Sequence, residues 1–186
     1  MKFSRLESND ELFSREILIS LTRMLNEFTH QFISSCLAVW SLQVATNTQS
    51  NTSLADYILK ILKESFHEVE SGVMLANLFD VHTAATTGVK SNWSESMYLI
   101  LNSLIERAGN LAYDLIKSIL GRMRNDSKVL GKSTVFSRCV LLVLNKIKAS
   151  GESVDADLLV TIEAILADNQ TLMKKSMQIA LKSIKN

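Results

Sequence analysis

The sequence predicts an all-α protein, and three observations indicate this fold class. Apolar residues recur three and four positions apart along most of the chain, a spacing that places them on one face of a helix. Proline is absent from all 186 residues, which favours helices joined by Ser-, Asn- and Gly-containing turns. The composition, 47% hydrophobic and 21% charged, is typical of a globular chain. We expect a single all-α domain over residues 1–186, with residues 1–9 as a flexible N-terminus.

The apolar pattern of the first half of the chain predicts two helical stretches. The first begins near Asp10 and runs to about residue 45, and Ser8 and Glu11 at its start have the spacing of a capping box. A polar linker over 46–52 separates it from the second stretch, whose apolar stripe fades near residue 79. Ser53 can cap that second stretch.

The second half predicts one long stretch and three shorter helices. The long stretch covers about 93–124, and Gly109 is a candidate break within it. The shorter helices are expected over 133–147, 155–167 and 171–185.

The starts of these stretches recur along the chain. They lie near residues 10, 53, 93 and 132, a recurrence of about 40 residues that is typical of helix-pair solenoids. The last third, over 133–147, 155–168 and 169–181, resembles HEAT-type repeats, in which a short Asp/Asn turn leads into a helix with basic and small residues at set places. This resemblance implies stacked antiparallel helix pairs, a HEAT-like α-solenoid. A compact helical bundle with three long helices explains the same periodicity, so both architectures stay open.

The cysteines and the apolar stretches indicate an intracellular location. Cys36 and Cys139 both lie in apolar helical runs and do not form a disulfide framework, so a reducing compartment is expected. The N-terminus lacks the apolar core of a signal peptide, and the stretches 33–44 and 135–147 are too short or too polar to span a bilayer. We expect a protein of the cytoplasm or nucleus, without membrane contact and without a cofactor.

Two Glu-x-x-His spacings suggest a metal site as one alternative. Residues three apart share a helix face, so a carboxylate and an imidazole can reach one metal ion, as in di-iron bundles. The two pairs are Glu27 with His30 and Glu64 with His67. Glu106 and Glu163 are candidates for the further carboxylates. Each pair lies at the edge of its apolar stripe, and exposed polar pairs that support a helix explain the same spacing, so no metal site is favoured.

A basic segment suggests a second kind of site. Its cations are Arg122, Arg124, Lys128, Lys132, Arg138, Lys146 and Lys148, and the last helix adds Lys174 and Lys175. Stacked helices would gather these charges into a surface for a nucleic-acid backbone or an acidic partner. A solvated helix face explains the run equally, because charge runs commonly keep a helix soluble.

Motifs for catalysis are incomplete. Gly131-Lys132-Ser133-Thr134 resembles the end of a phosphate-binding loop, but Asp126 stands where that loop needs its first glycine. We interpret these residues as a helix start, with Ser133 or Thr134 as the N-cap. Neither cysteine has a polar, electropositive setting that would generate a thiolate.

These observations favour a protein that is not an enzyme. We predict a protein–protein interaction or scaffold module that docks a partner on a helical face, with self-association as one form of that docking. Nucleic-acid or acidic-partner binding through the basic helix surface is the alternative, and a metal-binding bundle that uses the Glu-x-x-His pairs is the second alternative.

Overall fold

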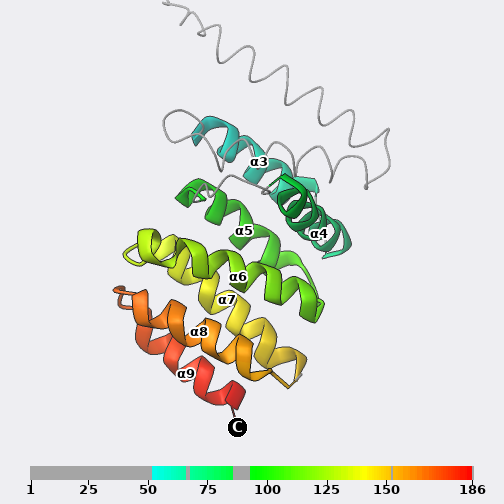
Figure 1. Cartoon of the computed structure of the whole chain (residues 1–186). Coiled ribbons are helices and arrows are strands. Elements are labelled where there is room, and N and C mark those ends of the chain that lie inside the picture. Colours follow the sequence, from blue (N-terminus) through cyan, green and yellow to red (C-terminus); the bar gives the residue numbers. More distant parts are fainter. Residues whose placement is uncertain (1–51, 66–67, 86–92, 152, 186) are drawn as a thin grey trace, which may run out of the picture.

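All regular structure in the described part of the chain is helical. The computed structural model describes residues 52–65, 68–85, 93–151 and 153–185, and those ranges contain helices and no strand (Figure 1). The helices are α3 (Thr52–Ser65), α4 (Glu68–Ala85), α5 (Glu95–Arg107), α6 (Tyr113–Leu130), α7 (Thr134–Ser150), α8 (Ala156–Asp168) and α9 (Lys174–Lys185). The predicted all-α class is confirmed.

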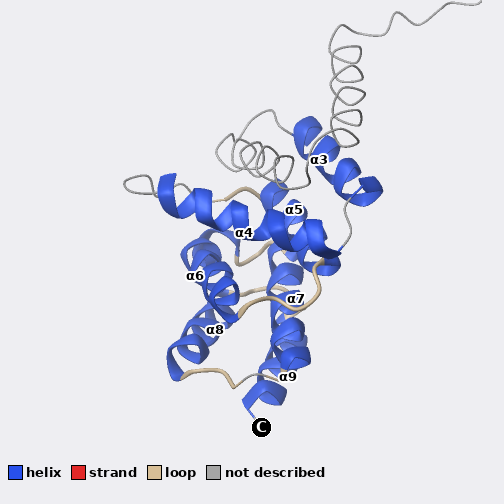
Figure 2. Ribbon diagram, turned by 90° about the vertical axis from the view of Figure 1, so that its right-hand side faces the viewer, coloured by secondary structure: helices blue, strands red, loops and turns tan. Residues whose placement is uncertain are grey.

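The helices stack in two layers. Helices α3, α5, α7 and α9 pack one on the next and form a first layer, whereas α4, α6 and α8 form a second layer. Figure 2 shows α5, α7 and α9 in one column and α6 and α8 in the other. Because successive helices alternate between layers, the chain builds stacked helix pairs, in agreement with the predicted architecture.

The helix boundaries sharpen the sequence interpretation. First-layer helices begin at Thr52, Glu95, Thr134 and Lys174, so their starts recur every 39 to 43 residues. The long stretch expected over 93–124 is two helices, and the break falls around Gly109 where the sequence marked one. The stretch expected over 53–79 is also two helices, and the second continues to residue 85. The helix expected near 10–45 lies outside the described residues, and so do Cys36 and the segment 1–9, for which the sequence predicts flexibility.

Side-chain capping marks the starts of α5, α7 and α8. Ser94, Ser133 and Asp155 each accept, through a side-chain oxygen, the backbone N–H three residues further on, at 3.3, 3.2 and 2.8 Å. Gly151 ends α7 with φ at 66°, a left-handed conformation that favours glycine. Ser133 is therefore an N-cap, as predicted, and the segment around Gly131 is a turn between α6 and α7.

One continuous apolar core lies between the layers. Its N-terminal part is built around an aromatic row in which Phe79, Trp93, Tyr98 and Phe136 follow one another at centroid distances of 5.6, 5.9 and 5.0 Å. The row connects α4, the start of α5 and α7, which belong to three successive helix pairs, so it holds these three pairs together. Burial of each large apolar side chain stabilises the fold by about 1.5–3 kcal/mol. None of the described helices has the length and apolarity needed to cross a membrane.

Candidate docking surface

A groove opens on the outer side of the first layer. It has a volume of about 430 Å³, and its walls come from α3, α5, the first turns of α7 and the segment before α9. Its apolar lining consists of Leu59, Leu99, Val135 and Met173. We call this hollow the α5–α7 groove.

The apolar lining of the groove is partly open to solvent. Leu99 is 40% exposed although it stands in the middle of α5, and Leu59, Val135 and Met173 are half-buried. An exposed apolar side chain is common on any surface, but several that line one hollow are typical of binding sites. The groove is therefore the best candidate for a docking surface in the described part of the chain.

Charged side chains stand on the rim of the groove. The Arg138 Nη2 donates a hydrogen bond to the Glu106 Oε1, and both side chains are exposed. Lys63 stands on the α3 side of the groove and is exposed. The rim thus holds two cations and one carboxylate, and Lys63 has no ion-pair partner among the residues whose side chains the structure describes.

Asn102 holds the two principal helices of the groove together. Its side chain is buried, and its Nδ2 donates to the backbone carbonyl oxygen of Val135 at 3.1 Å. Val135 belongs to the first turn of α7, so this hydrogen bond connects the middle of α5 with the start of α7. The floor of the groove is consequently fixed by a buried contact and does not depend on the rim charges.

Apart from Arg138 on the groove rim, the predicted basic residues separate into three groups, of which the first lies at one end of the stack. At that end α6 and α8 finish while α7 and α9 begin, and the backbone N–H of Gln170 donates to the carbonyl oxygen of Gly131 at 2.8 Å. We call the cations there the basic edge. They are Arg124, Lys128, Lys132, Lys174 and Lys175.

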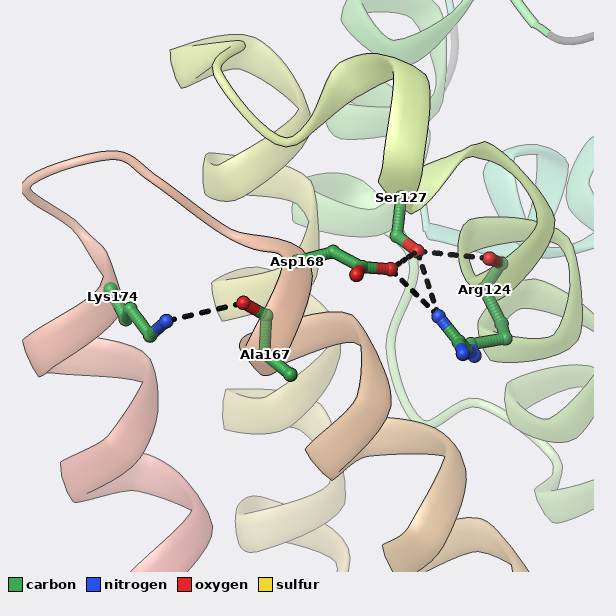
Figure 3. Close-up of polar contacts among 5 residues, drawn as sticks. All are labelled: Arg124, Ser127, Ala167, Asp168 and Lys174. Atoms are coloured by element: carbon green, nitrogen blue, oxygen red, sulfur yellow. Dashed lines mark hydrogen bonds and ion pairs between the residues drawn. The ribbon is translucent and has the colours of Figure 1, made fainter.

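A polar network closes this end of the stack (Figure 3). The Asp168 Oδ2 accepts hydrogen bonds from the Ser127 Oγ at 2.6 Å and from the Arg124 Nη1 at 2.7 Å. The hydrogen bond from Ser127 and, after it, the interaction with Arg124 lower the pKa of the Asp168 carboxyl. The Lys174 Nζ donates to the Ala167 carbonyl oxygen at 3.3 Å. Arg124 and Lys174 thus join neighbouring helices, whereas Lys128, Lys132 and Lys175 are exposed.

The second group consists of Arg122, which faces the interior. Its Nε and Nη2 donate to the two carboxylate oxygens of Asp126 at 2.9 and 3.0 Å, and Asp126 is fully buried. The guanidinium Cζ also lies 5.0 Å from the centre of the Trp93 ring. Arg122 therefore stabilises the core of the fold and does not contribute to the basic edge.

The third group lies toward the opposite end of α7. The Lys146 Nζ donates to the carbonyl oxygens of Ala108 and Gly109, which follow the end of α5. Lys148 is exposed in the last turn of the same helix. The length of α7 therefore separates these two lysines from the basic edge. Arg138 lies between the two ends of this helix, on the rim of the groove.

The metal-binding alternative falls largely outside the described residues. Glu27, His30 and His67 lie in segments that the structure does not describe. The backbone of Glu64 is described, but its side chain is not. Glu106 and Glu163 are described, and they pair with Arg138 and Lys185. Within the described ranges, no group of three His, Cys, Asp or Glu residues is placed to hold a metal ion.

Cys139 is a buried thiol. It is fully enclosed by the core, and this burial raises the pKa of its thiol well above the ordinary value. A thiol in this setting stays protonated and is a poor nucleophile, as the sequence predicted.

The comparison with known families identifies the relatives of this chain. The model of one family, described as Fanconi Anaemia group E protein FANCE, matches residues 2–185. The chain belongs to this family. No curated protein and no solved structure matches the chain.

The sequence interpretation missed the groove because its residues lie off the apolar stripes. The stripe of α5 contains Met97, Leu101 and Leu104, and Leu99 stands two residues from Met97, which is more than half a turn around the helix. A large apolar residue on the helix face opposite a complete apolar stripe is the sequence signal that could have indicated the groove. Which neighbouring residues surround Leu99 depends on how α3 and α7 pack beside α5, and periodicity alone does not give that.

Proposed function

We propose that this chain is a docking module of the Fanconi anaemia core complex, without catalytic activity of its own, that binds a protein partner on the outer side of its first layer. The family match over residues 2–185 supports this role, because the group E family is a non-catalytic component of that complex. The proposal includes a HEAT-like solenoid architecture and a nuclear location, both of which suit a subunit of that complex.

The observation that carries the proposal is the α5–α7 groove. The other large apolar side chains exposed in the described ranges do not line the groove: Val129, Val160 and Ile179 lie on α6, α8 and α9, and Leu172 lies in the turn before α9. Leu99 differs because it lines a hollow together with three further apolar residues and a charged rim. An apolar centre with a polar rim is the usual anatomy of a protein interface.

Co-elution with purified complex subunits tests this function. The full chain is mixed with each of the other purified core-complex proteins and analysed by size-exclusion chromatography with light scattering. We expect a stable heteromeric species with at least one of them, and the chain alone gives the control for self-association. If the chain elutes by itself from every mixture, the proposed function is wrong.

We infer a second candidate function, binding of a nucleic-acid backbone, from the lysines gathered at the basic edge. Lys128, Lys132 and Lys175 are exposed there, and Asp168 close by is already bound to Arg124. Phosphate contacts would make this affinity fall steeply as salt rises. Reversal of Lys128 and Lys132 to glutamate should weaken retention on a DNA or RNA column, whereas Lys148→Glu at the far end of α7 should not. Absence of retention of the original chain at low salt contradicts this second function.

A further inference from the structure

We propose that the α5–α7 groove binds a short acidic segment of a protein partner, with one large apolar side chain of that segment inserted between Leu59, Leu99 and Met173. This inference rests on the proposed docking function and gives the chemistry of the partner. It is carried by the shape of the groove, by its lining and by the charges around it.

The volume and lining suit an apolar anchor. A hollow of about 430 Å³ falls within the roughly 300–1,000 Å³ that ligand-binding pockets occupy. Four of its lining residues are aliphatic or methionine, and no lining residue whose side chain the structure describes is aromatic. A side chain such as leucine gains burial there, whereas a nucleic-acid base finds no ring on which to stack.

The charges around the groove are complementary to an acidic segment. Lys63 and Arg138 stand on the rim, and Glu106, the carboxylate among the described lining residues, is already bound to Arg138.

The start of α7 adds to the positive electrostatic potential of the groove. Thr134 is its first residue and lines the groove, so the positive end of the helix dipole lies at the groove wall. The described lining of the hollow carries two cations and one carboxylate, so it is net positive and favours a partner segment whose residues next to the anchor are aspartate or glutamate.

A set of matched peptides tests the inference. Three labelled peptides share one central leucine and differ only in its neighbours, which are glutamates, glutamines or lysines. Binding to the full chain is measured by fluorescence anisotropy at low and high salt. We expect the glutamate peptide to bind about tenfold more tightly than the glutamine peptide at low salt, because its carboxylates are attracted to the cations of the rim. The lysine peptide should bind most weakly.

Variants place the binding on the groove. Lys63→Glu should reverse the preference between the glutamate and lysine peptides, and Leu99→Asp should abolish binding of all three. Lys148→Glu is the matched control, because it changes the same charge at the other end of α7. Circular dichroism confirms that each variant remains folded, which is expected because all three side chains are exposed.

Several outcomes would overturn the inference. Equal binding of the three peptides, no binding of the glutamate peptide, or an equal loss in Lys63→Glu and Lys148→Glu would each contradict it. A homodimer that Leu99→Asp dissociates would make a second copy of the chain the occupant instead. If core-complex proteins co-elute with the chain while the peptides fail, the groove inference is wrong and the docking function stands. Failure of all co-elution contradicts the docking function, whatever the peptides do.

Discussion

Two polar networks on α6 use the same three chemical groups in opposite settings. In the interior, Asp126 accepts hydrogen bonds from Arg122 and from the Tyr98 hydroxyl, which lies 2.8 Å from the Asp126 Oδ2. At the basic edge, Asp168 accepts hydrogen bonds from Arg124 and from the Ser127 hydroxyl. Each network thus joins a carboxylate, a guanidinium and a hydroxyl.

The difference between them is burial. The side chains of Arg122 and Asp126 are 9% and 0% exposed, whereas those of Arg124 and Asp168 are 39% and 25% exposed. Burial and the negative charge of Asp126 raise the pKa of the Tyr98 hydroxyl well above its usual value, so this hydroxyl remains a donor. Two arginines that are two residues apart on one helix therefore serve the core and the edge respectively, because such a spacing turns side chains to opposite sides.

The largest effect is expected from breaking the interior network. Asp126→Ala leaves the Arg122 guanidinium buried without its carboxylate and removes the acceptor of the Tyr98 hydroxyl. Loss of one partner of a buried ion pair costs about 3–5 kcal/mol. Urea unfolding followed by circular dichroism measures the change in unfolding free energy. A loss under about 1 kcal/mol would show that the interior network is no more important than the edge.

A glycine at the edge sharpens the comparison. A Cβ at Gly131 would lie 2.4 Å from the Asp168 carbonyl oxygen and 2.9 Å from that of Ser127, both of them backbone atoms. Gly131→Ala must therefore push the two turns apart, at a cost of about 1–3 kcal/mol in the same unfolding experiment. Gly121→Ala on the same helix is the control, because a Cβ there meets nothing within 4 Å. That control should stabilise by about 0.5–1 kcal/mol, and equal effects of the two changes would refute the close approach.

The edge carboxylate should respond to pH in a defined direction. Because the pKa of Asp168 is lowered in the folded protein, its contribution to stability is present above the unfolded pKa of about 3.9 and is lost as the pH falls through the folded value. The difference in unfolding free energy between the original chain and Asp168→Asn should be constant near neutral pH and should shrink below about pH 4. A difference that grows on acidification would reverse the sign of this linkage.

The smallest effect on stability is expected on the groove rim. Arg138→Gln removes the exposed ion pair with Glu106, and exposed pairs contribute about 0–1 kcal/mol. The thermal midpoint should change little, while the salt dependence of partner binding should become weaker. A large loss of stability would mean that Arg138 belongs to the fold, as Arg122 does.

The sequence predicted the helices better than the destinations of their charged side chains. Periodicity gave the helical class and the recurrence of about 40 residues, because burial of one face per helix requires them. It could not show that Arg122 faces inward, since that depends on the packing of Trp93 and Tyr98 against the pair of Arg122 with Asp126, and both aromatic residues lie far from this pair in sequence. The groove was equally hidden, because Leu99 and Lys63 become neighbours only when α3 packs against α5.

A paired substitution on the two layers tests the docking claim most directly. Leu99 on α5 is 40% exposed in the groove, and Val160 on α8 in the second layer is 64% exposed. Each is changed to aspartate, and the affinity of each variant for the co-eluting core-complex protein is measured by isothermal titration calorimetry. We predict that Leu99→Asp weakens binding by at least about tenfold, or about 1.4 kcal/mol, while Val160→Asp leaves it unchanged. Loss of binding in Val160→Asp with full binding in Leu99→Asp would contradict a docking surface on the first layer.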